Sequence, residues 1–345
     1  MITVNRQIQN KLLQHAIEIL RLSKSEASKI VKLLDAKVYR EVITKYEAQL
    51  LKVRRLGSIS SINESQRLKE MMSSIQAILK VGMDNAYKQT RSSLTSLVEF
   101  EGRWNYKVLK KLTEPFNISF SMPSVATLRS VVTTRPFEGS ILKDWFGKLS
   151  NSTGIRIAEQ LNIGIVQGEP VVAMARRLES VIELSRRNAV SIVRTAVNNV
   201  STGARLATNE ANLDVIQGEQ LIATLDGRTT PECRALDGKI YPVGEGPRPP
   251  FHWNCRTTVV PVLKSWKALG IDLQEAPDGT RASMDGQVAD RMTYQQWLKG
   301  LSAAEQDDIL GPNRGEMFRN GMKLTSFVDV DFKPLTLEEL QRREL

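Results

Sequence analysis

Both cysteines of the chain and one of its two histidines lie close together in the sequence. His252 stands three positions before Cys255 in the stretch PPFHWNCR, and Cys233 precedes them in TLDGRTTPECRALDGKIYPV. Thiolate and imidazole are ligands that zinc takes in a tetrahedron, and Asp226, Asp237 or water would supply the fourth position. The pattern predicts a metal site at Cys233, His252, Cys255 and Asp226, with structural zinc as the candidate cofactor.

Other interpretations of these residues remain open. A cysteine nucleophile would need His252 as its base and a third group to orient the imidazole, yet PPFHWNC contains no glycine to build an oxyanion hole. Alternatively, His252 hydrogen-bonds a loop carbonyl while both thiols pack as small buried hydrophobes. A Cys233–Cys255 disulfide would form only outside a reducing cytoplasm. We predict no catalytic residue and do not expect an enzyme.

These residues fall in a segment whose composition differs from the rest of the chain. EQLIATLD and KIYPV have strand-like apolar content, LDG is a tight-turn signal, and CRTTVVPVL is typical of a returning strand. PVGEGPRPP is too rich in glycine and proline for a helix. We therefore expect a β-hairpin module over residues 219–262, with both cysteines and His252 in its loops.

The sequence before this module is predicted to be helical almost throughout residues 1–115. Ser23–Glu26 has the form of a capping box that opens a second helix, and Ser61–Glu64 is a second box. From the second box the helical period continues to about Leu112, which favours long antiparallel helices. The prolines of TEPFNISFSMPS place a boundary near residue 115.

Further helices are expected on both sides of the module. RPFEGSILKDWFGKLS and GIVQGEPVVAMARRLES predict short helices joined by glycine turns, and RNAVSIVRTAVNNVSTGARLATNEANL predicts a helix with a narrow face of small apolar residues. Capping boxes at Ser302–Glu305 and Thr336–Glu339 predict helices near the C-terminal end.

The expected fold class is mainly α with a small α+β module: long N-terminal helices, a helical middle, a β-hairpin loop module and C-terminal helices. We divide the chain into an extended basic helical region at 1–115, a central domain at 116–262 that contains the module, and a C-terminal helical segment at 263–345.

Positive charge is concentrated in the N-terminal half. The chain has 48 Lys and Arg against 38 Asp and Glu, and residues 1–150 hold 25 of the former against 13 of the latter. Such a surplus favours a polyanionic partner, and solvated helix surfaces are an equally weighted explanation. Because no aromatic residues interleave with the basic clusters, we expect non-specific contact with double-stranded DNA rather than sequence readout. The clusters spaced to meet phosphates are Lys52, Arg54, Arg55; Lys107, Lys110, Lys111; and Arg176, Arg177, Arg186, Arg187.

The sequence has no run of eighteen apolar residues, and its start, MITVNRQIQNK, lacks the apolar centre of a signal peptide. We therefore expect folding in a reducing cytoplasm, where two cysteines favour metal binding or free thiols. Membrane contact by the long helices is a minor alternative.

Several stretches in a fixed order resemble one protein family. RTAVNNVSTGARLATNEA is followed by TLDGRTTPECRALDGKIY and PPFHWNCRTTVVP. Together they resemble the head-morphogenesis domain of tailed phages, the Mu F-like minor head proteins. RPFEGSILKDWF and TYQQWLKGLSAAEQDDILGPNRGEMF resemble flanking segments of that family, so the likeness extends over roughly residues 115–345. The specific marks are Arg194-Thr195, Asp226, Arg228-Thr229, Cys233, Leu236-Asp237-Gly238, His252, Asn254 and Cys255-Arg256.

The resemblance implies a role rather than a reaction. A protein of this family would be a minor capsid component inside the virion head, assembled in the host cytoplasm. It would associate with the phage portal or the major capsid protein and take part in DNA packaging, retention or ejection. Family members bind DNA without sequence preference. A homo-oligomer and a coiled coil of the N-terminal helices are compatible with this role.

This sequence departs from the fuller family pattern at two positions. Many members carry a C-x-x-C pair before the hairpin and a C-R-C closure, where this chain has Thr230 and Thr257. Two ligands of a four-ligand site would then be missing. Hydrogen bonds from Thr229, Asp226 and Arg256 are expected to hold the same loops, with Arg256 paired to Asp226.

Two alternative functions belong to other classes. The protein would be a virion component ejected with the genome, or a zinc-dependent or thiol-dependent nuclease or toxin-like enzyme. An acidic cluster that would hold magnesium in such an enzyme is better explained as helix-surface charge. Its members are Asp285, Asp290, Glu305, Asp307 and Asp308.

Overall fold

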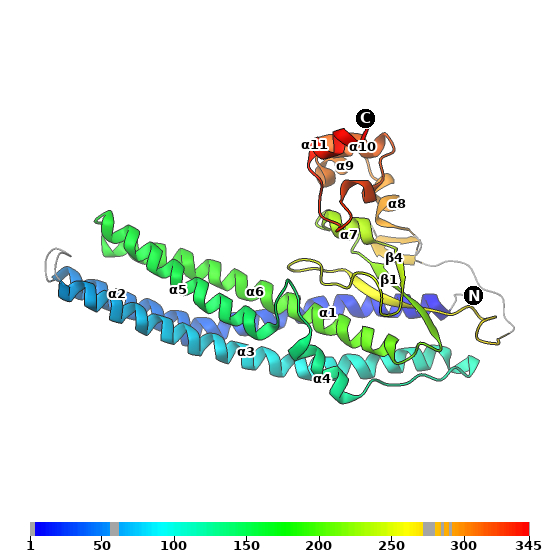
Figure 1. Ribbon diagram of the computed structural model, residues 1–345, viewed down its shortest axis with the longest axis horizontal. Coiled ribbons are helices and arrows are strands. Elements are labelled where there is room, and N and C mark those ends of the chain that lie inside the picture. The colour runs from blue at the N-terminus through cyan, green and yellow to red at the C-terminus, as the bar shows by residue number, and fades with distance from the viewer. Residues whose placement is uncertain (1–3, 56–61, 272–279, 284–285, 290–291, 345) are drawn as a thin grey trace. The chain divides into compact units, whose positions relative to one another are not determined.

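The structure, a computed structural model, describes residues 4–55, 62–271, 280–283, 286–289 and 292–344 (Figure 1). It confirms the predicted fold class, because helices dominate and the sheet is small. Among the described residues, no helix has both the length and the apolar character needed to cross a bilayer. The α-helices are α1 (Val4–Leu34), α2 (Arg40–Arg55), α3 (Ile62–Thr113), α4 (Val125–Thr134), α5 (Leu142–Val166), α6 (Val171–Glu210), α7 (Pro231–Leu236), α8 (Tyr294–Lys299), α9 (Ala303–Leu310), α10 (Pro312–Arg319) and α11 (Leu337–Glu344). The strands are β1 (Ile216–Ile222), β2 (Ile240–Pro242), β3 (Thr258–Leu263), β4 (Thr280–Ser283) and β5 (Gly286–Ala289).

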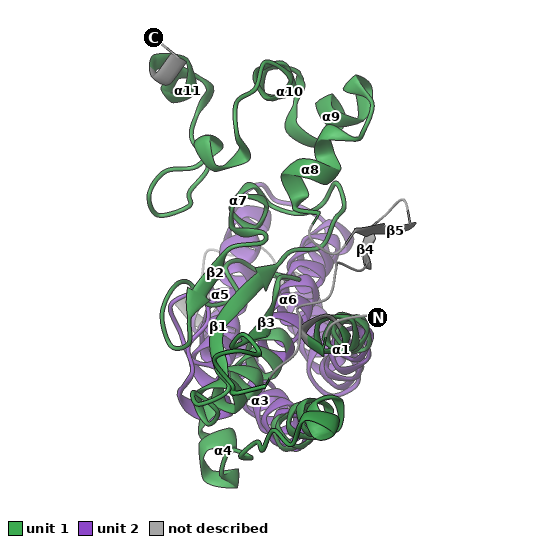
Figure 2. Ribbon diagram, turned by 90° about the vertical axis from the view of Figure 1, so that its right-hand side faces the viewer, with its two compact units in different colours: residues 1–20, 98–131, 198–345 green, residues 21–97, 132–197 purple. Residues whose placement is uncertain are grey.

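The chain forms two compact units, coloured separately in Figure 2. Unit 1 comprises residues 1–20, 98–131 and 198–345, and unit 2 comprises residues 21–97 and 132–197. Contact density does not test which segments fold by themselves, so the division at residues 115 and 262 stays a prediction.

One helix prediction in the N-terminal region was wrong because tertiary packing overrides a local signal. No second helix opens at Ser23, which lies inside α1 and is buried there. Apolar side chains continue on the buried face at Ile19, Ala27 and Ile30, so α1 has no reason to end between them. The helix that was predicted to follow Ser61–Glu64 does run from Ile62 to Thr113, whereas Ser61 itself lies outside the described residues.

The expected short helices after residue 130 are in fact long. Gly164 lies inside α5, where a Cβ atom would come within 2.8 Å of Met174 Cγ. The glycine therefore permits close packing instead of ending the helix. The turn comes four residues later at Gly168, whose φ of +63° suits glycine, and α6 then runs through the predicted 187–213 helix as far as Glu210.

Unit 2 is built from long helices packed side by side. A π-helical turn at Asp35–Tyr39 continues α1 into α2, and from it the Tyr39 hydroxyl donates to Ser185 Oγ of α6 at 2.8 Å. The Thr153 hydroxyl of α5 lies 2.9 Å from the same Ser185 oxygen. Gly82 of α3 packs directly against Val38 of the π-helical turn. A Cβ atom built on Gly82 would lie 2.2 Å from Val38 Cγ2.

Unit 1 contains the predicted strands as an antiparallel sheet in the order β2-β1-β3. One face of the sheet, with Ile222 and Val260, packs into a cluster that includes Leu12 of α1 and Leu109 of α3. The other face, with Leu221 and Val259, packs on Leu206 of α6 and Leu236 of α7. Because both faces are covered, the strands carry more apolar residues than a half-exposed sheet would.

The C-terminal helices α8 to α11 share a hydrophobic cluster with Leu225, including Tyr294, Trp297, Phe318 and Phe327. The predicted capping box at Ser302–Glu305 is confirmed at the start of α9. At Thr336–Glu339 the reciprocal hydrogen bonds of a capping box precede α11, as predicted. A further box at Thr293–Gln296 opens α8 and was not anticipated.

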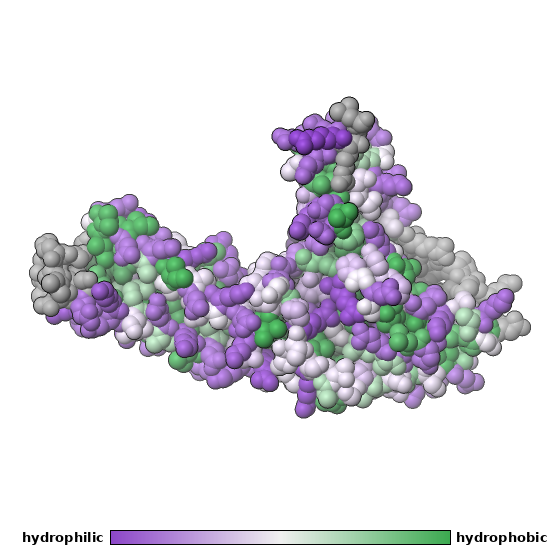
Figure 3. Space-filling model, viewed as in Figure 1, coloured by the Kyte–Doolittle hydropathy of each residue, from purple (hydrophilic) through white to green (hydrophobic). Residues whose placement is uncertain are grey.

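The face seen in Figure 3 is largely hydrophilic, with an apolar patch in unit 2 where α5 and α6 meet. Val166 and Val172 are the most exposed apolar residues there.

Candidate metal centre

A short helix positions the first residue of the candidate centre. Thr230 caps α7, its hydroxyl accepting from the backbone N–H of Cys233 at 3.5 Å, and Pro231 occupies the first helical position, where no N–H is needed. The prediction that Cys233 lies in a loop was therefore wrong, although the Thr-Pro pair signalled a helix start. The helix buries the Cys233 side chain.

His252 and Cys255 lie in the loop between β2 and β3, as predicted. The backbone N–H of Cys255 donates to the carbonyl of His252 at 3.1 Å and closes a tight turn. Asn254, the third residue of this turn, has a φ of +58°, which asparagine tolerates better than most residues. From α6, the Asn198 side-chain amide donates to the carbonyl of Cys255 at 2.9 Å.

The fold brings these three side chains together. The candidate ligand atoms of Cys233, His252 and Cys255 all lie within 4.8 Å of one another. The two Sγ atoms are 3.8 Å apart, so both cysteines are free thiols rather than a disulfide. Two sulfurs bound tetrahedrally at about 2.3 Å from a zinc ion would be separated by about 3.8 Å. His252 Nε2 lies 3.2 Å from Cys233 Sγ.

The orientation of the imidazole suits a ligand. His252 Nδ1 lies 2.9 Å from the carbonyl oxygen of Trp253, which only accepts hydrogen bonds, so Nδ1 carries a proton. In the neutral ring, Nε2 then directs its lone pair toward the sulfurs. Histidine ligands of metals are commonly oriented by such a second hydrogen bond.

The pKa values of the two thiols are shifted in opposite directions. The hydrogen bond with Cys233 and the neighbouring His252 hold the pKa of Cys255 well below the usual range. The hydrogen bond with Cys255 and burial raise the pKa of Cys233. Burial alone would lower the pKa of His252, but the Cys255 thiolate outweighs it and raises that pKa. Of the two thiols, Cys255 is therefore the one that loses its proton more easily.

Asp226 is not placed with these three residues. Its carboxylate accepts from Arg256 Nη1 at 2.5 Å and Nη2 at 2.7 Å, and from the backbone N–H of Arg228 at 3.0 Å. This confirms the predicted pairing of Arg256 with Asp226. Burial would raise the pKa of Asp226, but the hydrogen bonds and charge of Arg256 outweigh it and lower that pKa.

Two thiols and an imidazole fit a borderline-soft cation such as zinc, and they would supply three of its ligands. Thr230 and Thr257 occupy the two positions where the resemblance leads us to expect cysteines, and their hydroxyl groups lie beside Cys233. Hydrogen bonds from both threonines lower the pKa of Cys233 in part. Thr229 donates to the carbonyl of Thr224 at 2.5 Å, so hydrogen bonds hold these loops as expected.

The predicted DNA-binding residues differ in their surroundings. Lys107, Lys110 and Lys111 are exposed along one face near the end of α3, and Lys52 is exposed on α2. The side chains of Arg54 and Arg55 lie outside the described residues.

On α6, Arg176 and Arg187 are exposed, but their neighbours already have carboxylate partners. Arg177 pairs with Glu169 at 2.6 Å and Arg186 pairs with Asp35 at 2.7 Å. A phosphate would have to compete with those carboxylates.

The burial of Arg205 and the structural role of Asp237, which was named only as a candidate ligand and a mark of the family, were not anticipated. Arg205 of α6 is fully buried and donates to the carbonyl of Val259 at 2.8 Å and to the Thr258 hydroxyl. The Asp237 carboxylate accepts from the backbone N–H groups of Ala223 and Tyr294, each at 2.7 Å. Nothing in the local pattern marks Arg205 as buried, because arginine usually lies at the surface.

The fold and site define a mainly helical protein in which a long helix, a three-stranded sheet and a Cys–His cluster form one module. Residues 156–260, which include that module up to β3, match the family described as Phage Mu protein F like protein. The chain is also 26% identical over 255 residues to the minor head protein GP7 of Bacillus phage SPP1, covering 66% of this chain and 78% of GP7. No solved structure matches. The two sequence matches confirm the resemblance and support a phage minor head protein of the Mu F-like family.

Proposed function

We propose that this minor head protein associates with the portal or the major capsid protein and contacts packaged double-stranded DNA during head assembly, packaging or ejection. The observation that carries the proposal is one of position. The family match at 156–260 coincides with α6, the sheet and the Cys–His cluster, and the relative that matches beyond it is itself a minor head protein. In this proposal residues 116–262 are the head-morphogenesis domain.

Quantitative mass spectrometry of gradient-purified particles of the encoding phage tests the head assignment. We expect the chain in every particle, in copy numbers closer to those of the portal subunit than to those of the major capsid protein. Absence from finished particles, with presence in empty precursors, would instead make it a transient assembly factor.

The contact with DNA is proposed for the exposed lysines near the end of α3. Lys107, Lys110 and Lys111 are spaced three and four residues apart, so they share one helix face, and none of them makes a salt bridge within the described residues. Flexible ammonium groups of this kind contact phosphates without reading bases.

Salt-dependent binding of the full chain to random-sequence duplex DNA tests this surface. Each phosphate contact contributes a log–log slope of roughly −0.9, so the Lys107→Ala/Lys110→Ala/Lys111→Ala variant should lose about 2 to 3 of the slope. The matched control, Lys80→Ala/Lys88→Ala/Arg91→Ala, removes the same charge from exposed positions of the same helix. Equal losses of slope in both variants would mean that only the net charge matters, and would contradict a DNA-binding surface at the three lysines.

We propose an architectural role for Cys233, His252 and Cys255, which close the β2–β3 loop onto α7. When bound, zinc would supply a structural crosslink between the two elements and neutralise the sulfurs. Elemental analysis of the purified full chain, before and after mutation of Cys255 to serine, tests the metal. About one zinc per wild-type chain and none in the variant is the expected result; a zinc-free wild type would leave a hydrogen-bonded thiol–imidazole cluster in the same architectural role.

A further inference from the structure

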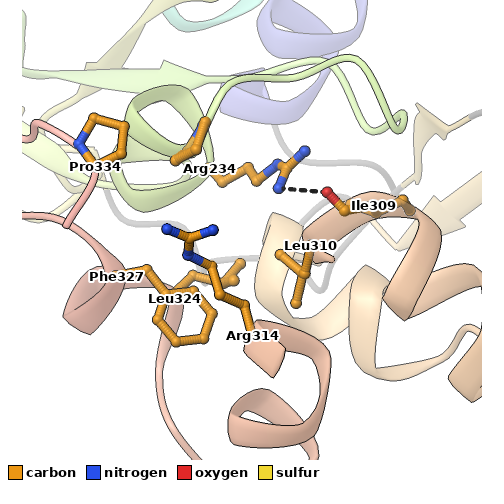
Figure 4. Close-up of a pocket in the computed structure, with 8 residues that line it drawn as sticks. Arg234, Ile309, Leu310, Arg314, Leu324, Phe327 and Pro334 are labelled. Atoms are coloured by element: carbon orange, nitrogen blue, oxygen red, sulfur yellow. Dashed lines mark hydrogen bonds between the residues drawn. The ribbon is translucent and has the colours of Figure 1, made fainter. Parts of the chain in front are cut away.

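A small cavity in unit 1 contains two arginines and is separate from the Cys–His cluster. It has a volume of about 210 Å³ and is bordered by α7, α9, α10 and the 3-10 turn Leu324–Phe327 (Figure 4). Arg234 of α7 and Arg314 of α10 line it together with apolar side chains. Those apolar side chains include Leu310, Leu324 and Phe327.

Among the described residues, no carboxylate forms an ion pair with the arginines of this cavity, although the charge of Asp226 acts on Arg234 and Arg234 lies over the Tyr294 ring. Within the described residues, neither Arg234 nor Arg314 forms a salt bridge, and their hydrogen bonds go to backbone carbonyls. Arg234 donates to Ile309 at 3.2 Å and to Gly227 at 3.3 Å, and Arg314 donates to Leu335 at 2.8 Å.

Arg234 is also incompletely satisfied. Its side chain is 8% exposed, and its Nε is buried without a hydrogen-bond acceptor among the described residues. A buried guanidinium that lacks a counter-ion is costly, and a carboxylate is the ligand that best matches its planar donors. Together with the half-buried Arg314 beside the same cavity, Arg234 therefore favours an anionic ligand.

The walls and the size restrict that ligand further. A bound phosphate would leave the leucine and phenylalanine side chains of the cavity exposed to water. A ligand that also carries an apolar group would pack against them. Pockets that enclose drug-sized molecules measure about 300–1,000 Å³, so this smaller cavity suits about one amino-acid residue. The carboxylates of Asp and Glu side chains bring little apolar surface with them. A C-terminal residue presents its α-carboxylate and an apolar side chain from the same position.

We propose that this cavity binds the C-terminal residue of a partner protein, with the α-carboxylate held by Arg234 and Arg314 and an apolar side chain against Leu310, Leu324 and Phe327. The site is independent of the Cys–His cluster and of DNA binding. It gives the C-terminal helices a recognition role in addition to their packing.

The test uses methyl NMR spectra of the full chain, with N-acetyl-leucine and N-acetyl-leucinamide as probes. The acid should shift the methyl signals of Ile309, Leu310 and Leu324, and the amide, which lacks the charge, should bind at least about tenfold more weakly. Inorganic phosphate should leave these methyl signals unchanged. Equal binding of acid and amide, or phosphate shifts as large as those of the acid, would overturn the proposal.

Variants locate the effect. Arg314→Gln should weaken N-acetyl-leucine binding by about tenfold, and Arg314→Lys by less, because it keeps the charge but loses the planar donors. Arg319→Gln is the matched control: it lies on the same helix and pairs with Asp307, but does not line the cavity. If Arg314→Gln does not fold, the comparison of acid with amide on the wild-type protein still decides the proposal.

Discussion

The two compact units differ in what they bury. Among the described side chains of unit 2, the buried polar ones are serines and threonines, such as Ser185 and Thr153. Every buried Asp, Glu, Arg or His side chain among the described residues lies in unit 1, and these include His15, Glu101 and Arg205. Long amphipathic helices meet along continuous apolar stripes and need only hydroxyl pairs between them. In unit 1 buried charges act both between helices, where Glu101 accepts from Ser201, and between helix and sheet, where Arg205 donates to the carbonyl of Val259.

The contrast predicts different sensitivities. Burying a charge is costly, but removing one partner of an existing buried pair costs still more because the other charge remains unpaired. Unit 1 should therefore be sensitive to single polar deletions, whereas unit 2 should be sensitive to changes in packing volume.

The largest effect is expected for Glu101→Ala in unit 1. Glu101 is fully buried, accepts from the Ser201 hydroxyl at 2.7 Å and lies 2.5 Å from His15 Nε2. Without the Glu101 carboxylate, the buried His15 and Ser201 side chains lose this hydrogen-bond partner, so we expect a loss of about 3–5 kcal/mol in the free energy of unfolding. Chemical denaturation of the full chain measures it.

Glu99→Ala is the matched control on the same helix. Glu99 pairs with Arg129 near the surface, and such pairs contribute about 0–1 kcal/mol. If the two variants lost similar stability, the buried charges of unit 1 would have no special role.

A packing change should be the corresponding weak point of unit 2. Gly82→Ala places a methyl group 2.2 Å from Val38 Cγ2, so α3 and the π-helical turn Asp35–Tyr39 must move apart, at a cost of about 1–3 kcal/mol. Gly147→Ala in α5 meets no atom within 4 Å and should instead stabilise by about 0.5–1 kcal/mol through helix propensity. Opposite signs in thermal unfolding would support the packing explanation, and equal signs would contradict it.

His252→Ala tests the Cys–His cluster as a stabilising element. The variant loses the contacts of Nε2 with Cys233 and of Nδ1 with Trp253, so unfolding should become easier by about 1–3 kcal/mol. Arg228→Ala, whose side chain is 84% exposed, serves as the control and should change stability by less than about 1 kcal/mol. A chelator should lower the stability of the wild type and leave His252→Ala unchanged if zinc is bound.

The smallest effect concerns acid. Arg256 keeps the folded-state pKa of Asp226 below the value of about 3.9 found in unfolded chains. The pair therefore contributes stability that is complete above about pH 4 and is lost as the pH falls through the folded-state pKa.

Arg256→Gln should remove this contribution and flatten the acid side of the stability profile between about pH 4 and pH 2. Asp226→Asn should have the same flattened profile, because it removes the group that titrates. Unfolding free energies measured across this range check both variants, and an unchanged slope would contradict the assignment.

The sequence predicted much of the fold where local patterns and tertiary packing agree. The second long helix starts and ends close to the expected residues because its apolar period is unbroken from Ile62 to Thr113. The prediction of a helix start at Ser23 failed, because a capping box shows where a helix can start and not whether one must. The expectation of short helices joined by glycine turns failed for the same kind of reason, since glycine permits both a turn and a close helix contact.

By itself, the sequence determined the fold class, the strands of the module and the identity of four candidate ligands, of which Asp226 lies apart from the other three, because residue type and period are local properties. Only the tertiary structure decided that Cys233, His252 and Cys255 meet without Asp226, and that Arg205 is buried. Arg234 and Arg314 likewise line one cavity although eighty positions separate them in the chain. These outcomes depend on which distant segments pack together, and that depends on the free energy of the whole fold rather than on any one stretch.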